Sequence, residues 1–231
     1  IRDPLWSRGL GDVYKRQMIH PAATPLTQQE RQQFVDVVTP HLSDNMNRNV
    51  GIHGLQRFNK TGKLIGTALT VKVRGGDNLL VYKAMTMLQD GHVLVIDAQG
   101  DENNAIIGEL IKLDCIRRGC VGFVIDGAIR DVASFENTPC YARSITHRGP
   151  FKTGPGEINV PVIVGGQIVN PGDIIVGDED GVVSFPYAHK DELLALAAKH
   201  ADKENKVKEM IASGVENQSW YMDLLREKGY L

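Results

Sequence analysis

The chain has 231 residues, of which 42% are hydrophobic and 23% charged, and this composition excludes a disordered, collagen-like or disulfide-scaffold protein. Its 26 basic and 28 acidic residues give a formal charge of −2, which offers no electrostatic basis for nucleic-acid binding, so small molecules are the expected partners. Three cysteines in unpatterned spacing favour buried thiols over disulfides or a zinc site, and with them a reducing, cytoplasmic location; they are Cys115, Cys120 and Cys140.

Residues 1–17 are expected to lie outside the fold. They contain no apolar core of a signal peptide, Met18 follows them as a natural start, and they resemble translated adapter sequence. A transit peptide is the alternative, but such segments avoid acids and this one carries Asp3 and Asp12. We therefore expect a non-native or unstructured leader over 1–17 and a single domain over 18–231.

The first predicted element is a helix from Thr27 to about His41. Its apolar residues recur at helical spacing, and Thr27 and Glu30 are placed as a capping box. Strand-like runs follow at 64–73, 92–98 and 120–127. Helical patterns at 79–89 and about 104–118 separate them. This alternation predicts parallel strands joined by right-handed crossovers.

After Arg130 the pattern changes to short strands broken by proline and glycine. The runs CYARSI, VPVIVGG, DIIVG and GVVSFP predict a β-rich second half with some antiparallel pairing. A charged helix then runs from Tyr187 to about Ile211, Gly214 is its predicted stop, and a final helix passes through Leu224. No stretch approaches 18 apolar residues, so no segment is expected to span a membrane.

Two loop motifs each fit two interpretations. RGGDN, residues 74–78, fits either a tight turn before a capped helix or an anion site at the helix amides. KTGPG, residues 152–156, fits either a rigid turn or an anion cradle, and His147 and Arg148 either a solvent-facing loop or a substrate mouth. Neither GxGxxG nor GxxxxGK[ST] occurs in the chain, which argues against nicotinamide and ATP chemistry.

An acid stands at the carboxyl end of the predicted strand 92–98, early in the helix that follows. This is Glu109, and open α/β sheets usually bind their ligands at such a position. The alternative is that Glu109 only complements the helix dipole and pairs with Lys112.

Charges also crowd at the end of the next apolar run. Asp126, Arg130 and Asp131 are costly there unless they pair, bind substrate or hold a metal. Arginine matches a carboxylate or an enolate, and aspartate offers a hard oxygen ligand for Mg²⁺ or Mn²⁺. Twenty residues, one helix plus one strand, separate Glu109 from Arg130, so we expect these groups to meet at one sheet edge and to form a site for an α-keto acid.

These motifs resemble those of the RraA-like family, which contains the divalent-metal pyruvate aldolases for 4-hydroxy-4-methyl-2-oxoglutarate and 4-carboxy-4-hydroxy-2-oxoadipate. The resemblance covers about Leu26 to Leu231 and rests on RGGDN, GELI with IDGAIRD, RGPFKTGPGEINVPV and NPGDIIVGDEDGVVSFP. It implies an α/β/β/α layered fold of the swivelling type, with mixed sheets and N- and C-terminal helices. It also implies homo-oligomers, trimers or dimers of trimers, with active sites at subunit interfaces.

The resemblance further implies a role for each site residue. Asp131 would be the direct ligand of Mg²⁺ or Mn²⁺, and Arg130 would bind the pyruvyl group. Glu109 stands where aldolases of the family usually carry an aspartate and where the ribonuclease regulator lacks an acid. A further acid reaches over from the neighbouring subunit's C-terminal helix, and Glu204 is its match here. The substrate carboxylate would be bound by the amides of Gly108, Glu109, Leu110 and Ile111.

The implied activity is pyruvate release from a small 2-oxo acid through an enolate. The metal would polarise the substrate, Arg130 would share the charge of the enolate, and a metal-bound water would pass a proton toward Glu109 and Glu204. Oxaloacetate decarboxylation passes through the same enolate without that base, so both activities are expected. The alternative is a non-catalytic protein of this family that binds and inhibits a ribonuclease, but the acid at position 109 favours the enzyme.

Overall fold

Long apolar strands form the centre of the molecule. The computed structural model describes residues 18–48, 50–216 and 218–231. Its longest strands are β2 (Leu64–Val73), β3 (His92–Ile107) and β4 (Gly122–Ile129), which are buried over most of their length. Parallel strands that are covered on both faces typically have continuous apolar sequences of this kind.

The main sheet is mixed, with the strand order β1-β5-β4-β3-β2-β9-β10. β2, β3, β4 and β5 (Cys140–Ile145) pair in parallel, as the alternation of strands and helices predicts. The antiparallel strands of this sheet are β1 (Gln56–Arg57), β6 (Gly156–Ile158), β9 (Ile174–Gly177) and β10 (Val182–Phe185). A separate hairpin joins β7 (Val162–Val164) to β8 (Gln167–Val169).

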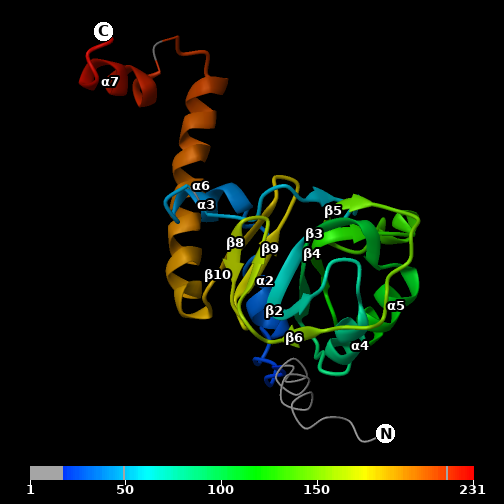
Figure 1. Ribbon diagram of the computed structural model, residues 1–231. Helices are drawn as coiled ribbons and strands as arrows, with labels where there is room; N and C mark the ends of the chain where they lie inside the picture. Colours follow the sequence, from blue (N-terminus) through cyan, green and yellow to red (C-terminus); the bar gives the residue numbers. More distant parts are fainter. Residues whose placement is uncertain (1–17, 49, 217) are drawn as a thin grey trace, which may run out of the picture.

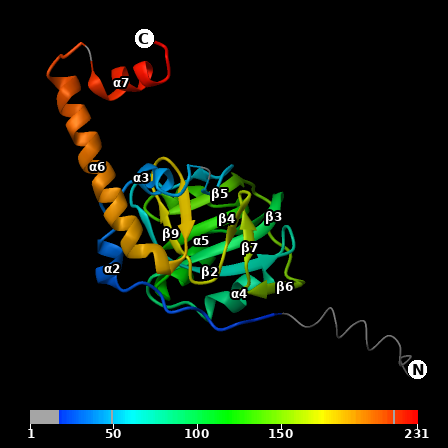
Figure 2. The same ribbon diagram turned by 90° about the vertical axis from the view of Figure 1, so that its left-hand side faces the viewer.

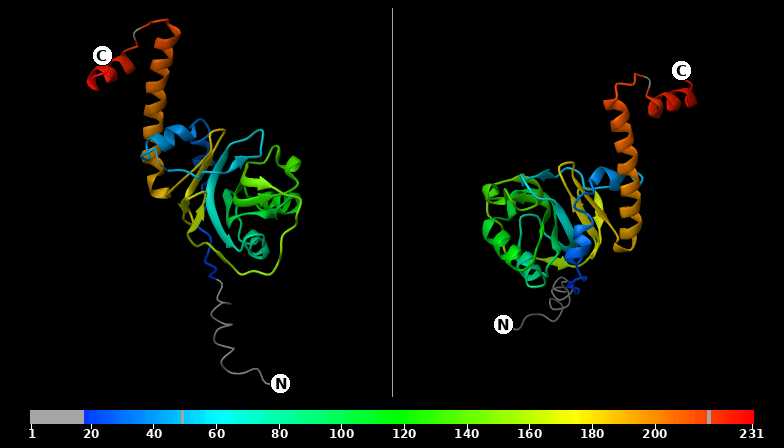
Figure 3. Two further views of the ribbon diagram at one scale, coloured as in Figure 1. Left: turned by 45° about the horizontal axis from the view of Figure 1, so that its top comes forward. Right: turned by 180° about the vertical axis from the view of Figure 1, so that it is seen from behind.

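Three buried clusters hold four layers together (Figures 1 and 3). Helices α4 (Leu79–Met85) and α5 (Glu109–Arg117) pack on one face of the parallel strands, and the β7-β8 hairpin packs on the other. Helices α2 (Gln28–Gln32), α3 (Thr39–Asp44) and α6 (Lys190–Ala212) cover β9 and β10 on the opposite flank of the molecule. The predicted α/β/β/α layered fold is therefore confirmed.

Helix α6 extends beyond the body of the molecule (Figures 1 and 2). The buried residues of α6 are Lys190, Leu193 and Ala197, all in its first half. Gly214 follows the helix with a φ of +73°, as expected for a stop, and α7 (Ser219–Glu227) comes next without a buried residue. Among the described helices none is both long and apolar enough to cross a membrane.

The predicted helix from Thr27 to about His41 is wrong in its length. The capping box of Thr27 and Glu30 is present, but α2 ends at Gln32 and α3 begins only at Thr39. Pro40 explains where α3 begins, because proline has no N–H to donate and is tolerated only in the first turn of a helix. Leu42 is fully buried, so the apolar pattern of this segment still indicated a side chain that faces the core.

The predicted helix at about 104–118 is wrong over its first turn. Residues 105–107 continue β3, because Ala105 and Ile107 pair with Ala128 and Ile129 of β4 beyond an irregular stretch of both strands. Burial of this segment in the sheet overrides its helical spacing. The helix α5 therefore starts at Glu109.

The smaller elements include two that the sequence did not predict as separate helices. Two 3₁₀ helices, η1 (Val132–Phe135) and η2 (Tyr187–His189), precede β5 and α6. The three cysteines are free and buried, as predicted, and burial raises the pKa of Cys120 to about 11. The predicted leader at 1–17 lies outside the described residues.

Candidate functional site

The ends of two parallel strands bring most of the predicted site residues together. Ile107 of β3 pairs with Ile129 of β4, and the N–H of Arg130 donates to the carbonyl of Ile107 at 3.0 Å. Residues 108–109 and 130–131 therefore leave the sheet at the same edge. The spacing of twenty residues between Glu109 and Arg130 therefore predicted correctly that these residues lie at the same edge.

Asp131 is held against the start of α5. Its Oδ2 accepts a hydrogen bond from the backbone N–H of Glu109 at 3.1 Å and lies 3.7 Å from Nε of Arg130. Its φ of +56° places it in the left-handed region, which aspartate enters more readily than most residues. Backbone strain of this kind clusters at functional sites. The Asp131 carboxylate is thus oriented by its neighbours.

Gly108 makes this close contact possible. A Cβ atom at position 108 would lie 2.5 Å from Oδ2 of Asp131 and 2.9 Å from Cγ of Arg130. The backbone of Gly108 is extended, with φ −145°, so any residue would accept its conformation. Glycine is required here by space alone.

A cavity of about 470 Å³ opens beside Arg130 and Asp131. The side chains of Arg130 and Asp131 are 43% and 48% exposed, so both can be reached by a small ligand. His147 lines the same cavity, which favours the substrate-mouth interpretation of this residue. The sequence reasoning missed Thr146, because only the parallel pairing of β5 with β4 brings the end of β5 to this edge.

The donor set at this edge suits a hard divalent cation. Mg²⁺ and Mn²⁺ prefer oxygen ligands, and Mg²⁺ usually binds through one or two carboxylates together with waters and substrate oxygens. One oxygen of Asp131 accepts the Glu109 amide, so the carboxylate is anchored while its side chain is still half-exposed beside the cavity. Asp131 is therefore a suitable ligand for such a cation.

The first amides of α5 are partly occupied. The N–H of Glu109 already donates to Asp131. Because α5 starts at Glu109, the N–H groups of Leu110 and Ile111 have no acceptor within the helix. These two amides are the ones that remain for a substrate carboxylate at the positive end of the helix dipole.

Two charges that were predicted beside the site have other partners. The ammonium of Lys112 donates to the carbonyl of Ser134 at 2.6 Å, rather than forming the predicted alternative pair with Glu109. Asp126 forms an ion pair with Arg143 and accepts a hydrogen bond from the N–H of Gly165 at 3.1 Å. Asp126 is a buried structural carboxylate, since β4 continues beyond it to residue 129.

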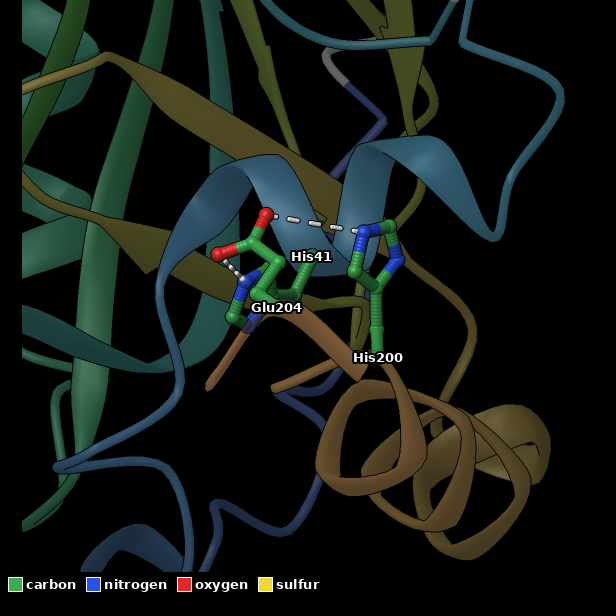
Figure 4. Close-up of side chains that lie close together, drawn as sticks. All are labelled: His41, His200 and Glu204. Carbon is green, nitrogen blue, oxygen red and sulfur yellow. Dashed lines mark ion pairs between the residues drawn. The ribbon is translucent and has the colours of Figure 1, made fainter. Parts of the chain in front are cut away.

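Glu204 lies on α6, on the opposite flank of the molecule from α5 (Figure 1). Its carboxylate is 3.1 Å from Nε2 of His41 and 3.6 Å from Nε2 of His200 (Figure 4). It is also 3.4 Å from Nζ of Lys208. The hydrogen bond with His41 lowers the pKa of Glu204 below its usual value. One chain does not bring Glu204 to Arg130, so its role at a neighbouring subunit's site stays a prediction.

The two loop motifs bind each other. The fully buried carboxylate of Asp77, in RGGDN, accepts hydrogen bonds from the N–H of Leu79 at 2.9 Å and of Gly154 at 3.0 Å, and from the N–H and hydroxyl of Thr153 at 2.7 and 2.8 Å. Burial opposes ionisation, but these hydrogen bonds outweigh it and lower the pKa of Asp77. The turn interpretation therefore holds for both motifs, because Asp77 already occupies the KTGPG amides.

Comparison with known proteins gives the relatives of the chain. A family model described as RraA-like, Aldolase/RraA, matches residues 39–184. A protein of Halalkalibacterium halodurans named "Putative 4-hydroxy-4-methyl-2-oxoglutarate aldolase" is 40% identical over 176 residues, which are 74% of this chain and 84% of that protein. The solved structure of the RNA-processing inhibitor RraA from Thermus thermophilis has a TM-score of 0.60 and 28% identity, over 66% of this chain and 94% of that one. A structure of an uncharacterized protein from Pseudomonas syringae has a TM-score of 0.73 at 24% identity, over 84% and 96% of the two chains, and shows a likeness of fold alone.

Proposed function

Because the chain belongs to the RraA-like family, we propose that it is a divalent-metal-dependent aldolase that releases pyruvate from 4-hydroxy-2-oxo diacids of the 4-hydroxy-4-methyl-2-oxoglutarate type. The same site would decarboxylate oxaloacetate, since both reactions pass through a pyruvate enolate. The observation that carries the proposal is the meeting of Glu109, Arg130 and Asp131 at one sheet edge, beside a cavity open to small ligands. The named relative at 40% identity supports the same reaction class.

Asp131 is the residue that would hold the cation. When bound, Mg²⁺ or Mn²⁺ supplies a positive charge that polarises the 2-oxo group and the adjacent carboxylate of the substrate. The amide of Glu109 keeps the Asp131 carboxylate in one orientation. The amides of Leu110 and Ile111, at the start of α5, would bind the substrate carboxylate.

Arg130 stabilises the charge that develops during bond cleavage. In the aldol cleavage the C3–C4 bond breaks, and its electron pair moves into the enolate of pyruvate. The guanidinium of Arg130 lines the cavity, is always charged, and donates N–H groups in a plane that suits an enolate and its carboxylate. This interaction is stronger in the transition state than in the substrate, which is the requirement for catalysis.

Glu109 is the proposed proton acceptor. Cleavage converts the C4 hydroxyl of the substrate to a carbonyl, so its proton must leave, and Glu109 is the exposed acid at the start of α5. The enolate then takes a proton from water at C3 and becomes pyruvate. Decarboxylation breaks a bond to CO₂ instead and requires no such base. The proposed reaction uses residues of one chain, and a further acid from Glu204 of a neighbouring copy stays a prediction.

The oligomer and the location of the protein are also part of the proposal. We expect trimers or dimers of trimers and no nucleic-acid or membrane partner. The three buried, free thiols support a reducing compartment such as the cytoplasm.

Arg130→Ala tests the proposal directly. The purified chain with Mg²⁺ or Mn²⁺ should release pyruvate from oxaloacetate and from 4-hydroxy-4-methyl-2-oxoglutarate, measured with a coupled dehydrogenase. The variant should remain folded, because the Arg130 side chain is half-exposed, but should lose about 10²–10³-fold in kcat for both substrates. The control is Arg117→Ala, which removes an exposed arginine of α5 that pairs with Asp114, and it should retain activity. Retained turnover in Arg130→Ala would overturn the proposal.

Glu109→Gln separates the two reactions. Since only the aldol cleavage needs a base, this variant should lose about 10²–10⁴-fold in pyruvate release from the hydroxy substrate. Oxaloacetate decarboxylation should change much less. Equal losses would contradict the assigned role of Glu109. A wild-type chain that releases no pyruvate from either substrate with any divalent metal would instead favour a non-catalytic regulator.

A further inference from the structure

Two histidines and one glutamate meet where α6 leaves the body of the molecule. His41 lies on α3, whereas His200 and Glu204 are one turn apart on α6. Their ligand atoms all lie within 4.8 Å of one another. Figure 4 shows both imidazole rings beside the two oxygens of the carboxylate. We propose that this cluster is a second metal site, for Zn²⁺ or a similar transition-metal ion, and it does not depend on the proposed function.

The distances in the cluster match those of metal ligands. In a tetrahedral zinc site, with bonds of about 2.0–2.1 Å, neighbouring ligand atoms stand about 3.3 Å apart. Glu204 Oε2 is 3.1 Å from Nε2 of His41, and Oε1 is 3.6 Å from Nε2 of His200. The two rings are stacked, with centroids 4.8 Å apart and planes 19° from parallel. The two Nε2 atoms therefore face the two oxygens of one carboxylate, and small rotations would bring them around an ion.

Asp44 lies beside the cluster, next to His200, but is not one of the three residues whose ligand atoms all lie within 4.8 Å of one another. Its Oδ2 is 3.7 Å from Nε2 of His200, while its Oδ1 is 3.4 Å from Nε of Arg48. The carboxylate of Glu204 in the cluster and that of Asp44 nearby would offset the charge of a bound Zn²⁺ next to the lysines that line the adjacent cavity. Lys208 must leave Glu204, but its pair is long and Lys208 is mostly exposed, so the pair contributes little.

The cluster is reachable from solvent. The side chains of His41, His200 and Glu204 are 12%, 24% and 43% exposed. A cavity of about 690 Å³ lies beside them and is lined by Asp44, His200 and Glu204. An ion therefore has an entry path, while His41 is buried enough to keep its orientation.

The ligand types separate this site from the one at Asp131. Imidazole nitrogens suit zinc, copper and nickel, whereas Mg²⁺ and Mn²⁺ prefer oxygen. A Glu204 side chain that binds zinc within its own chain is not available to a neighbouring subunit's active site. Glu204 can therefore serve either as a zinc ligand within its own chain or as an acid at a neighbouring subunit's active site. A measurement of zinc binding distinguishes these two roles.

The position of the cluster indicates what the metal would do. Ala197 is the last buried residue of α6, and His200 lies less than one turn further on. A metal bound by both α3 and α6 would therefore fix the direction in which the projecting half of α6 leaves the molecule (Figure 1). The site would act as a structural clamp, because its three ligands come from two different helices and an ion bound to them would tie these helices together.

Zinc binding by the full chain, free of any histidine tag, tests this proposal. The chain is loaded with Zn²⁺, dialysed, and assayed for zinc by mass spectrometry, and affinity is measured by competition with a chromophoric chelator. We expect one zinc per chain. Co²⁺ in its place should show the visible absorption of a tetrahedral complex, which Mg²⁺ cannot produce.

Matched variants locate the ion. His41→Ala and His200→Ala should each weaken zinc binding by at least about 100-fold, more than the loss of a hydrogen-bonding partner of a ligand usually causes. The control is His189→Ala, because His189 also pairs with a glutamate, Glu192, at the start of the same helix. Asp131→Asn should also keep its zinc. If His41→Ala fails to fold by circular dichroism, His200→Ala decides, since His200 lies beyond the buried half of α6.

The proposal is overturned by any of three results: a wild-type chain without stoichiometric zinc, histidine variants that bind as His189→Ala does, or loss of the zinc in Asp131→Asn. These results bear on the role of Glu204, but not on pyruvate release by Glu109, Arg130 and Asp131. Failure of the zinc site and failure of the proposed function are therefore distinguishable.

Discussion

At the scale of single residues, the candidate active site depends on one very close contact. Gly108 lies so near Asp131 and Arg130 that no side chain fits between them. The contact orients the Asp131 carboxylate through the Glu109 amide and leaves the guanidinium of Arg130 at the cavity wall. The chemistry thus relies on a residue that has no functional group of its own.

Gly108→Ala tests this contact. The added methyl group would push Asp131 and Arg130 apart, and misplacement by about 1 Å costs about 10²-fold in rate. We expect that loss in kcat/KM for pyruvate release, with a fall of about 1–3 kcal/mol in the free energy of unfolding from overpacking. The control is Gly149→Ala, whose Cβ would meet only the tip of Arg130 at 3.3 Å and should have a smaller effect. Unchanged kinetics in Gly108→Ala would show that the contact is unimportant.

At the scale of elements, one buried carboxylate joins two loops. Asp77 accepts the N–H of Leu79 at the start of α4 and also binds Thr153 and Gly154 in the loop before β6. That loop crosses the end of β2, where β6 pairs in the antiparallel direction. An ionised Asp77 therefore holds α4, β2 and β6 in one arrangement.

Asp77→Asn should weaken this arrangement in a pH-dependent way. The pKa of Asp77 is lower in the folded chain than its ordinary value of 3.8, so its stabilising contribution is complete above that value and is lost as the pH falls through the folded pKa. At pH 7 the variant should lose about 1–3 kcal/mol, because an amide NH₂ would face backbone N–H donors. Urea unfolding at pH 7 and at pH 3 measures the difference between the two proteins, which should shrink at low pH. A constant difference would contradict this account.

At the scale of the whole molecule, the two candidate sites lie on opposite flanks. The Arg130 site adjoins the start of α5, whereas the His41 cluster lies on α3 and α6, which are on the other flank of the molecule (Figure 1). Helix α7 has no buried residue and carries exposed apolar side chains such as Trp220 and Leu224. Such a surface favours contact with another protein chain.

The native mass tests the predicted oligomer. For a trimer or a dimer of trimers, light scattering should give a mass of three or six times the 25.4 kDa of one chain. Removal of residues 213–231 deletes the exposed apolar side chains of α7 and should lower the mass if α7 contributes to the interface. A wild-type monomer at micromolar concentration would contradict the predicted assembly.

The sequence by itself determined most strands and helices and the meeting of Glu109 with Arg130 and Asp131, and its resemblance to the RraA-like family implied the layered fold. Apolar periodicity located the strands and helices. The length of one helix plus one strand between Glu109 and Arg130 indicated that both lie at the same edge of the sheet. Tertiary structure alone decided that residues 105–107 continue β3, that Asp77 joins two loops, and that His41 meets His200 and Glu204. Each of these depends on contacts between segments far apart in the chain, and packing energy of that kind leaves no local pattern in the sequence.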